Sequence, residues 1–151
     1  MITKKGKDLK KEIKVRLIKH ITFLEKEISD YEKFKSLTWG EYDQDRDKRR
    51  NVERWVENII SSSIDISKII LASEDRLLPD TYKNVVLTIS LVPGFDKETM
   101  EHLAEWVKLR NIVAHEYLDI RWNQIKRFIN ETEVPYKIFL ESVKKYLKNK
   151  L

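Results

Sequence analysis

The chain has 151 residues with a formal net charge of +5, and 36% of its residues are charged, well above the roughly one quarter usual in globular domains. Three glycines and three prolines can build few turns, which excludes β-sandwiches and barrels and favours long helices. The absence of cysteine excludes disulfides and thiolate metal sites, and the three histidines, His20, His102 and His115, are too scattered for a zinc site. We therefore expect a single helical domain over residues 1–151, with no metal or cofactor.

The positive charge is concentrated at the two ends of the chain. Residues 1–19 hold eight basic and two acidic side chains, and residues 137–150 hold five lysines and one glutamate. Such ends either attract phosphate backbones or are simply solvated tails. No apolar run approaches the ~18 residues that span a bilayer, and the basic start lacks the apolar core of a signal peptide. We expect a cytoplasmic protein with no membrane partner.

Hydrophobic periodicity predicts two long helices in the first half of the chain. The first covers about 8–35, where apolar residues recur at spacings of three and four. The segment "SLTWGEYDQD" then breaks the pattern. The second covers about 45–73 and carries a polar stripe beside its apolar one. That stripe is either the solvated side of a bundle helix or the wall of a cleft. The second interpretation makes Arg54 and Asp65 candidate substrate-binding residues.

The second half predicts a short helix and two longer ones. Pro79 can open a short helix at about 80–90, which Pro93-Gly94 closes. Asp96 is a plausible N-cap for a helix that runs to about His115. A last helix covers about 122–148, and Pro135 kinks or restarts it. The expected fold is all-α, an up-and-down bundle of four long helices plus a short fifth helix.

The stretch "LRNIVAHEY", residues 109–117, places an arginine, an asparagine, a histidine and a tyrosine close together in a largely apolar helix. On a regular helix Asn111 falls on the bundle-facing stripe, while Trp106, Leu109 and Val113 form a second apolar stripe opposite it. We expect that second stripe to be buried against another subunit. Arg110 and His115 lie ~140° apart on such a helix. They can therefore converge only if the helix distorts near His115 or if a second subunit completes the site.

The same stretch resembles a known motif. Its pattern Arg110-x4-His115-x-Tyr117 is the R-x4-H-x-Y motif of HepT-like toxins in the HEPN superfamily. The segments "RNVERWVENIISSSIDISKII", "LPDTYKNVV" and "VPGFDKETMEHLAEWVKLRNIVAHEYLDI" are also similar to that family, in order and at similar spacing. The resemblance covers roughly residues 46–125, and no motif position departs from the pattern.

The resemblance implies the toxin of a two-gene toxin–antitoxin module. It implies a homodimeric, metal-independent endoribonuclease whose RNA substrate is cleaved at the dimer interface. Arg110, His115 and Asn111 would be its catalytic residues. The partner would be a minimal nucleotidyltransferase antitoxin that adenylylates Tyr117. The residue types suit this chemistry, because a histidine can transfer protons near neutral pH and an arginine can hold a phosphate through paired N–H donors.

Other functions remain open from the residues alone. The chain could be a non-catalytic module that binds nucleotides or works with a nucleotidyltransferase. In that case Arg110 would bind phosphate and His115 would take no part in catalysis. It could also be a purely structural partner of the antitoxin. Without the resemblance, Arg110 would be expected to form a salt bridge with Glu105 or Glu116, His115 to be partly buried, and Tyr117 to be core. The four tryptophans, Trp39, Trp55, Trp106 and Trp122, are predicted to anchor the packing.

Overall fold

The computed structural model describes residues 2–150 and the side chains of residues 10–150. Leu9 and the N-terminal lysines up to Lys7 therefore lie outside the described side chains. The elements are α1 (Ile2–Ser29), α2 (Tyr31–Lys35), α3 (Trp39–Gln44), α4 (Arg46–Ser73), α5 (Tyr82–Thr88), a 3₁₀ turn η1 (Ile89–Leu91), α6 (Lys97–Trp106), α7 (Leu109–His115), α8 (Leu118–Glu131) and α9 (Glu133–Lys150). Residues 2–150 contain no strand, so the all-α prediction is confirmed.

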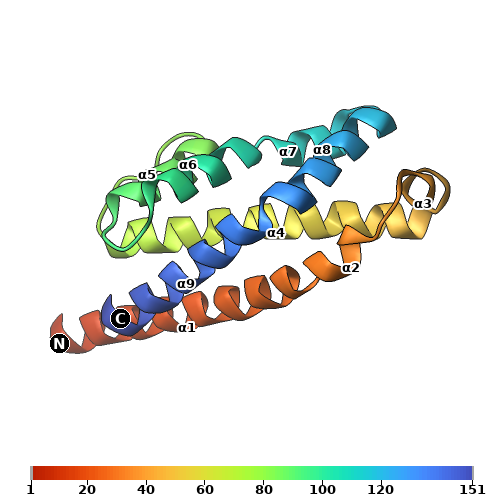
Figure 1. Ribbon diagram of the computed structural model, residues 1–151. Helices are drawn as coiled ribbons and strands as arrows, with labels where there is room; N and C mark the ends of the chain where they lie inside the picture. Colours follow the sequence, from red (N-terminus) through yellow and green to blue (C-terminus); the bar gives the residue numbers. More distant parts are fainter. Residues whose placement is uncertain (1, 151) are drawn as a thin grey trace.

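The long helices form an up-and-down bundle with α4 in the middle (Figure 1). Helix α1 runs antiparallel to α4, α6 and α7 return along the other side of α4, and α8 and α9 run back across the bundle. Helix α1 packs against both α4 and α9, and α4 also packs against α5 and α7. The described ends of α1 and α9 consequently lie at the same end of the molecule.

Three of the four predicted long helices are interrupted. The first ends at Ser29 and restarts at Tyr31, and the last is divided at Thr132. The helix predicted from Asp96 to His115 is divided between Trp106 and Leu109. Pro135 lies in the first turn of α9, where a missing N–H costs no helical hydrogen bond. The break at Thr132 is tied to the core, because its hydroxyl lies 2.6 Å from the hydroxyl of Tyr31. The prediction that Pro135 restarts the helix is confirmed.

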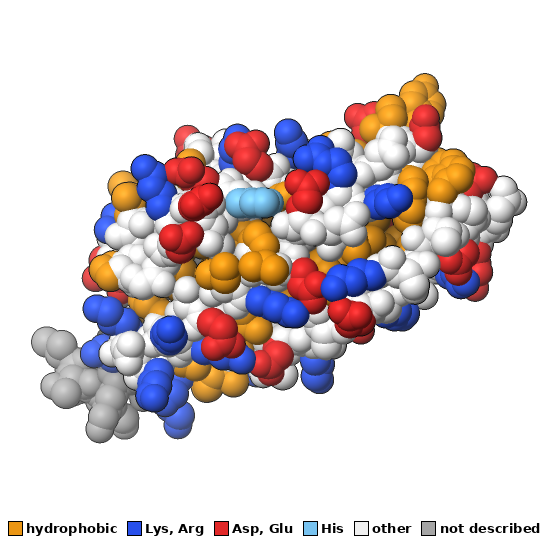
Figure 2. All heavy atoms as spheres, viewed as in Figure 1, with side chains coloured by type: hydrophobic (Ala, Val, Ile, Leu, Met, Phe, Trp, Pro, Cys, Tyr) orange, Lys and Arg blue, Asp and Glu red, His pale blue; other side chains and the backbone are white. Residues whose placement is uncertain are grey.

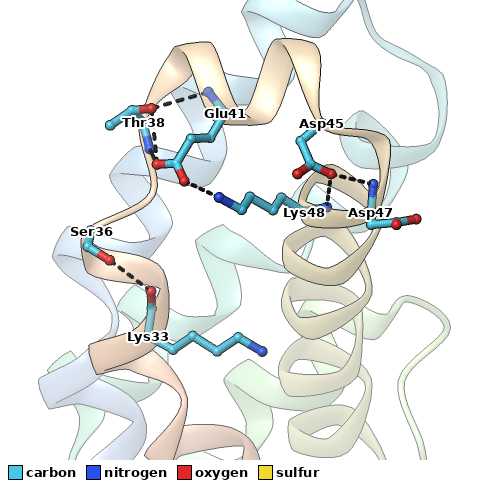
Figure 3. A network of polar contacts seen from close by, with 7 residues as sticks. All are labelled: Lys33, Ser36, Thr38, Glu41, Asp45, Asp47 and Lys48. Carbon is cyan, nitrogen blue, oxygen red and sulfur yellow. Dashed lines mark hydrogen bonds and ion pairs between the residues drawn. The ribbon is translucent and has the colours of Figure 1, made fainter.

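Side-chain caps fix the beginning of α3 and α4 (Figure 3). Thr38 and Glu41 form a capping box, in which the Thr38 hydroxyl accepts from the Glu41 N–H and the Glu41 carboxylate accepts from the Thr38 N–H. Asp45 caps α4 by accepting from the N–H groups of Asp47 and Lys48 at 3.0 and 3.2 Å. These local signals explain why the start of α4 was predicted within one residue.

The core is rich in aromatic side chains. Trp55, Trp106 and Trp122 are buried, as predicted, and the indole N–H of Trp55 donates to the carbonyl of Glu27 at 2.7 Å. Trp39 differs from the prediction, because it is 41% exposed, although its ring lies near those of Tyr42 and Trp122. On the face shown in Figure 2, basic and acidic side chains are intermixed rather than gathered in one basic patch.

Candidate active site

A groove lies between α4, α5 and α7. It consists of two adjoining hollows of about 500 and 510 Å³ that share Glu57, Arg110 and Ala114, and we call it the Arg110 groove. Its cationic side chains are Arg50, Arg54, Lys83, Lys108 and Arg110. Its carboxylates are Glu53, Glu57 and Glu105. Five cations against three carboxylates favour an anionic ligand.

A larger hollow of about 950 Å³ lies beside this groove, between α5, α6 and α8. It contains neither Arg110 nor His115. Its four glutamates outnumber its lysine and arginine side chains, which are Lys83, Lys108 and Arg127, and His102 also lines it. This charge balance disfavours a polyanion, so the smaller Arg110 groove is the better candidate despite its size.

Arg110 is partly buried and has no ion pair among the described residues. Its Nε atom is buried and has no hydrogen-bond partner there. The guanidinium carbon lies 5.4 Å from the centre of the Tyr82 ring, within the range of a cation–π contact. Because Arg110 forms no ion pair and no side-chain hydrogen bond among the described residues, its guanidinium can bind an anion that enters the groove.

Two of the three carboxylates in the groove, Glu105 and Glu53, are engaged with other cations, and Glu57 forms no ion pair among the described residues. Glu105 pairs with Lys83 at 3.0 Å, and this contact holds the pKa of Glu105 below its usual range. Glu53 pairs with Arg121 at 3.2 Å and also accepts from the Tyr42 hydroxyl. The salt bridge between Arg110 and Glu105 that composition alone would suggest is therefore absent. The positive charge of Arg110 remains available to a ligand.

Two of the other predicted residues line the groove and one does not. Asn111 is exposed and lines the same half of the groove as Tyr82. Arg54 lines the half that faces α4. Asp65 follows Arg54 by eleven residues, or roughly 16 Å along a helix, and it lines neither half of the Arg110 groove nor the larger hollow. The structure therefore brings Arg54 to the candidate site and leaves Asp65 outside it.

His115 and Tyr117 lie outside the groove in a single chain. His115 occupies the last turn of α7 and is exposed, while Tyr117 is 80% exposed at the beginning of α8. Helix α7 runs from Leu109 to His115, so Arg110 and His115 remain on different sides of it. The interpretation of His115 as partly buried and of Tyr117 as core is thus wrong. Both side chains are accessible to a substrate or a partner.

The predicted helix from Asp96 to His115 breaks at Val107 and Lys108. The N–H of Val107 bonds to Ala104 and that of Asn111 to Lys108, so the turn is tighter than an α-helix. The tighter turn changes the phase of α7 relative to α6. The buried face consequently moves from one apolar stripe in α6 to the other in α7, where Leu109 and Val113 are buried, and Trp106 before the break is buried as well.

The break overturns two predictions. The second apolar stripe is not left for another subunit, because the chain buries it by itself. Asn111, expected on the bundle-facing stripe, is exposed in the groove instead. No glycine or proline marks the break in the sequence.

Arg121 connects the site to the bundle, and sequence analysis missed it. Its guanidinium donates to the carbonyl of Val113 at 3.0 Å, in the last turn of α7, and pairs with Glu53 on α4. Burial and the hydrogen bond to Glu53 raise the pKa of Tyr42, so its hydroxyl remains a donor at neutral pH. This network fixes the end of α7 that carries His115. Glu53 and Arg121 are far apart in the sequence, so no local signal could have paired them.

None of the helices within residues 2–150 is long and apolar enough to cross a membrane. No group of three or more His, Asp or Glu side chains is placed to hold a metal ion in that part of the chain.

Residues 24–143 match the family model of HepT-like ribonucleases. Because this match covers most of the chain, the protein belongs to the HepT-like ribonuclease family. A search of curated proteins finds no match.

Solved structures with the same fold are toxin–antitoxin complexes. A mutant MntA–HpeT complex matches with a TM-score of 0.73 at 15% identity, covering 85% of this chain and 97% of the other. A tri-AMPylated *Shewanella oneidensis* HEPN toxin in complex with MNT antitoxin matches with a TM-score of 0.73 at 16% identity, covering 85% and 96%. A toxin–antitoxin structure with AMP-PNP matches with a TM-score of 0.73 at 16% identity, covering 85% and 95%. At these identities the likeness establishes the fold.

Proposed function

We propose that the protein is the toxin of a two-gene toxin–antitoxin module and acts as a metal-independent endoribonuclease. The observation that carries this proposal is Arg110, a cation without an ion pair whose buried Nε lacks a partner in a groove. Family membership and the Arg110-x4-His115 motif support ribonuclease chemistry at that cation.

The reaction uses groups that the RNA and the chain provide. The 2′-hydroxyl attacks the adjacent phosphorus, the bond to the 5′-oxygen breaks, and the products carry a 2′,3′-cyclic phosphate and a 5′-hydroxyl. His115 transfers the proton that leaves the 2′-oxygen or the proton that the 5′-oxygen gains. Arg110 stabilises the additional negative charge on the phosphoryl oxygens through its N–H donors. Asn111, on the groove wall, orients the phosphate.

The active form is a homodimer in which two chains complete each site. Arg110 lines a groove in one chain while His115 is exposed on another side of α7, so a single chain does not bring them together in that groove. Helix α7 ends at His115, and its last turn leaves that side chain exposed and outside the groove, which supports a second chain as the source of the histidine. A second copy that presents its His115 to the Arg110 groove would complete the site.

The first test uses protein expressed without its neighbouring gene and freed of metal by excess EDTA. The wild-type chain should cleave total RNA to ends that carry 2′,3′-cyclic phosphate, and His115→Ala should not. Because His115 is exposed, this variant should keep the wild-type melting temperature. A folded, unmodified wild-type protein that leaves RNA intact would contradict the ribonuclease proposal and favour a non-catalytic nucleotide-binding module.

The second test asks whether each site combines two chains. Arg110→Ala and His115→Ala are each inactive, and they are mixed under conditions that exchange subunits. If Arg110 and His115 act from different chains, each mixed dimer has one intact site. An equal mixture then recovers about a quarter of wild-type activity, since half of the dimers are mixed. If both residues act within one chain, the mixture stays inactive.

The partner is a nucleotidyltransferase antitoxin, and Tyr117 is the group that it modifies. The tyrosine hydroxyl attacks the α-phosphorus of ATP, which transfers an adenylyl group and releases pyrophosphate. Its 80% exposure makes Tyr117 reachable for such an enzyme. Hydrophobic side chains are exposed at this end of the molecule, where α7 meets α8 (Figure 2). The adduct adds negative charge near the active site and repels RNA.

Intact-mass measurement after incubation with the antitoxin and ATP tests the modification. Each adenylyl group adds its mass to the wild-type chain, and Tyr117→Phe should lose the adduct that tyrosine carries. Ribonuclease activity of Tyr117→Phe should then resist the antitoxin if inhibition is covalent. Inhibition of that variant to the wild-type extent would show that the antitoxin acts by direct binding instead.

A further inference from the structure

Tyr82 is the aromatic side chain that contacts Arg110. It is the first residue of α5, directly after Thr81, whose hydroxyl caps that helix by accepting from the Asn84 N–H. The cap fixes the direction in which the ring leaves the helix. The ring is 49% exposed, lines the Arg110 groove and lies 5.4 Å from the Arg110 guanidinium carbon. Tyr82 is thus part of the groove wall rather than of the core.

A ring and a carboxylate hold an arginine with different consequences. A carboxylate would fix the guanidinium but would also neutralise it and occupy the N–H donors that a phosphate needs. An aromatic ring attracts the cation through its electron-rich face and accepts none of its N–H groups in the guanidinium plane. An arginine that must bind a phosphate is therefore better oriented by a ring.

The surroundings of Arg110 agree with this distinction. Glu105 is held by Lys83, the residue that follows Tyr82, and Glu53 is held by Arg121. The start of α5 therefore supplies both the ring that contacts Arg110 and the cation that engages a neighbouring carboxylate. Lys68 of α4 also lies over the Tyr82 ring, at 4.6 Å, so the ring connects α4, α5 and α7.

From these contacts we infer that Tyr82 is a positioning residue, which orients the Arg110 guanidinium for a phosphate while leaving its charge and N–H donors free. This inference rests on the proposed function for the consequence in RNA cleavage. The contact between ring and guanidinium can be tested without any cleavage. The phenol hydroxyl has no part in it, so phenylalanine should replace tyrosine.

The direct test is NMR of the Arg110 Nε–H group in the full-length protein. The resonance is assigned by its loss in Arg110→Lys, and the Tyr82 ring should shift it away from the resonances of exposed arginines. Tyr82→Leu should remove that shift, and Tyr82→Phe should keep it. Phe23→Leu is the matched control, because Phe23 is 42% exposed on α1 and does not line the groove. An unchanged Arg110 signal in Tyr82→Leu would overturn the inference.

The second test measures cleavage of an RNA oligonucleotide. Losing a cation–π contact should lower kcat/KM by about 2- to 30-fold in Tyr82→Leu. Tyr82→Phe and Phe23→Leu should stay close to wild type. If Tyr82 only supported folding, Tyr82→Leu would lower the melting temperature and leave kcat/KM per folded molecule unchanged, which would also refute the inference. If the wild type cleaves no RNA, the proposed function fails, while the NMR result still decides whether Tyr82 positions Arg110.

Discussion

Replacing Arg121 by methionine should destabilise the protein more than any exchange of a surface arginine. The Arg121 and Glu53 side chains are only 19% and 16% exposed, and Arg121 also donates to the Val113 carbonyl. Breaking a fully buried ion pair costs about 3–5 kcal/mol, and an exposed pair contributes about 0–1 kcal/mol. Because the Arg121–Glu53 pair is still partly exposed, we expect Arg121→Met to lower the free energy of unfolding by about 2–3 kcal/mol. For a domain of this size, that loss lowers the melting temperature by about 5–10 °C.

Urea denaturation of Arg121→Met beside Arg127→Met provides the assay. Arg127 pairs with Glu131 on the surface of α8, with 59% and 41% exposure, so its loss should cost about 1 kcal/mol or less. Adding Glu53→Gln to Arg121→Met should recover part of the loss, because the carboxylate left without its cation is then neutral. The argument fails if Arg121→Met costs no more than Arg127→Met, or if Glu53→Gln makes the double variant worse.

Three further outcomes are expected. Gly94→Ala should lower the free energy of unfolding by about 1–2 kcal/mol, because φ is +95° at this position. Gly40→Ala should not destabilise the protein, because Gly40 is helical and an added Cβ would make only an ordinary contact. Urea denaturation measures both variants. Hydrogen bonds from the side chain and N–H of Thr99 hold the pKa of Asp96 below its ordinary value of 3.8. Asp96→Asn should therefore be less stable than wild type at neutral pH. The difference should shrink as the pH falls below 3.8 and vanish once Asp96 is protonated in the folded protein. Persistence of the difference at pH 2 would contradict this assignment. Lys83→Met should weaken the binding of single-stranded RNA, measured by fluorescence anisotropy with a cleavage-deficient chain. Adding Glu105→Gln to Lys83→Met should restore part of the lost affinity. Equal binding by the unsubstituted chain, Lys83→Met and the double variant would refute the pairing argument.

Local signals determined where several helices begin. Asp96 caps α6 as predicted, and Asp45, at the predicted start of the second long helix, caps α4, since a side-chain oxygen needs only N–H groups two or three residues ahead. The motif from Arg110 to Tyr117 also marked the candidate site and the family resemblance from the sequence alone. These features depend on neighbours in the chain, so pattern and spacing were sufficient to predict them.

The tertiary structure decided how that segment is presented. The tight turn at Val107 follows from no local residue preference. It lets the buried face of α6 continue in α7 on a different side of the helix, and that gain exists only once the bundle has formed. The contacts of Arg110 with Tyr82 and of Arg121 with Glu53 join helices that are distant in the sequence. The sequence by itself thus determined the all-α class, the helix caps and the motif residues. Only packing decided that Arg110 lies in a groove without an ion pair, while His115 is exposed outside that groove. The physical reason is that the free energy of each contact depends on which side chains the bundle places beside it.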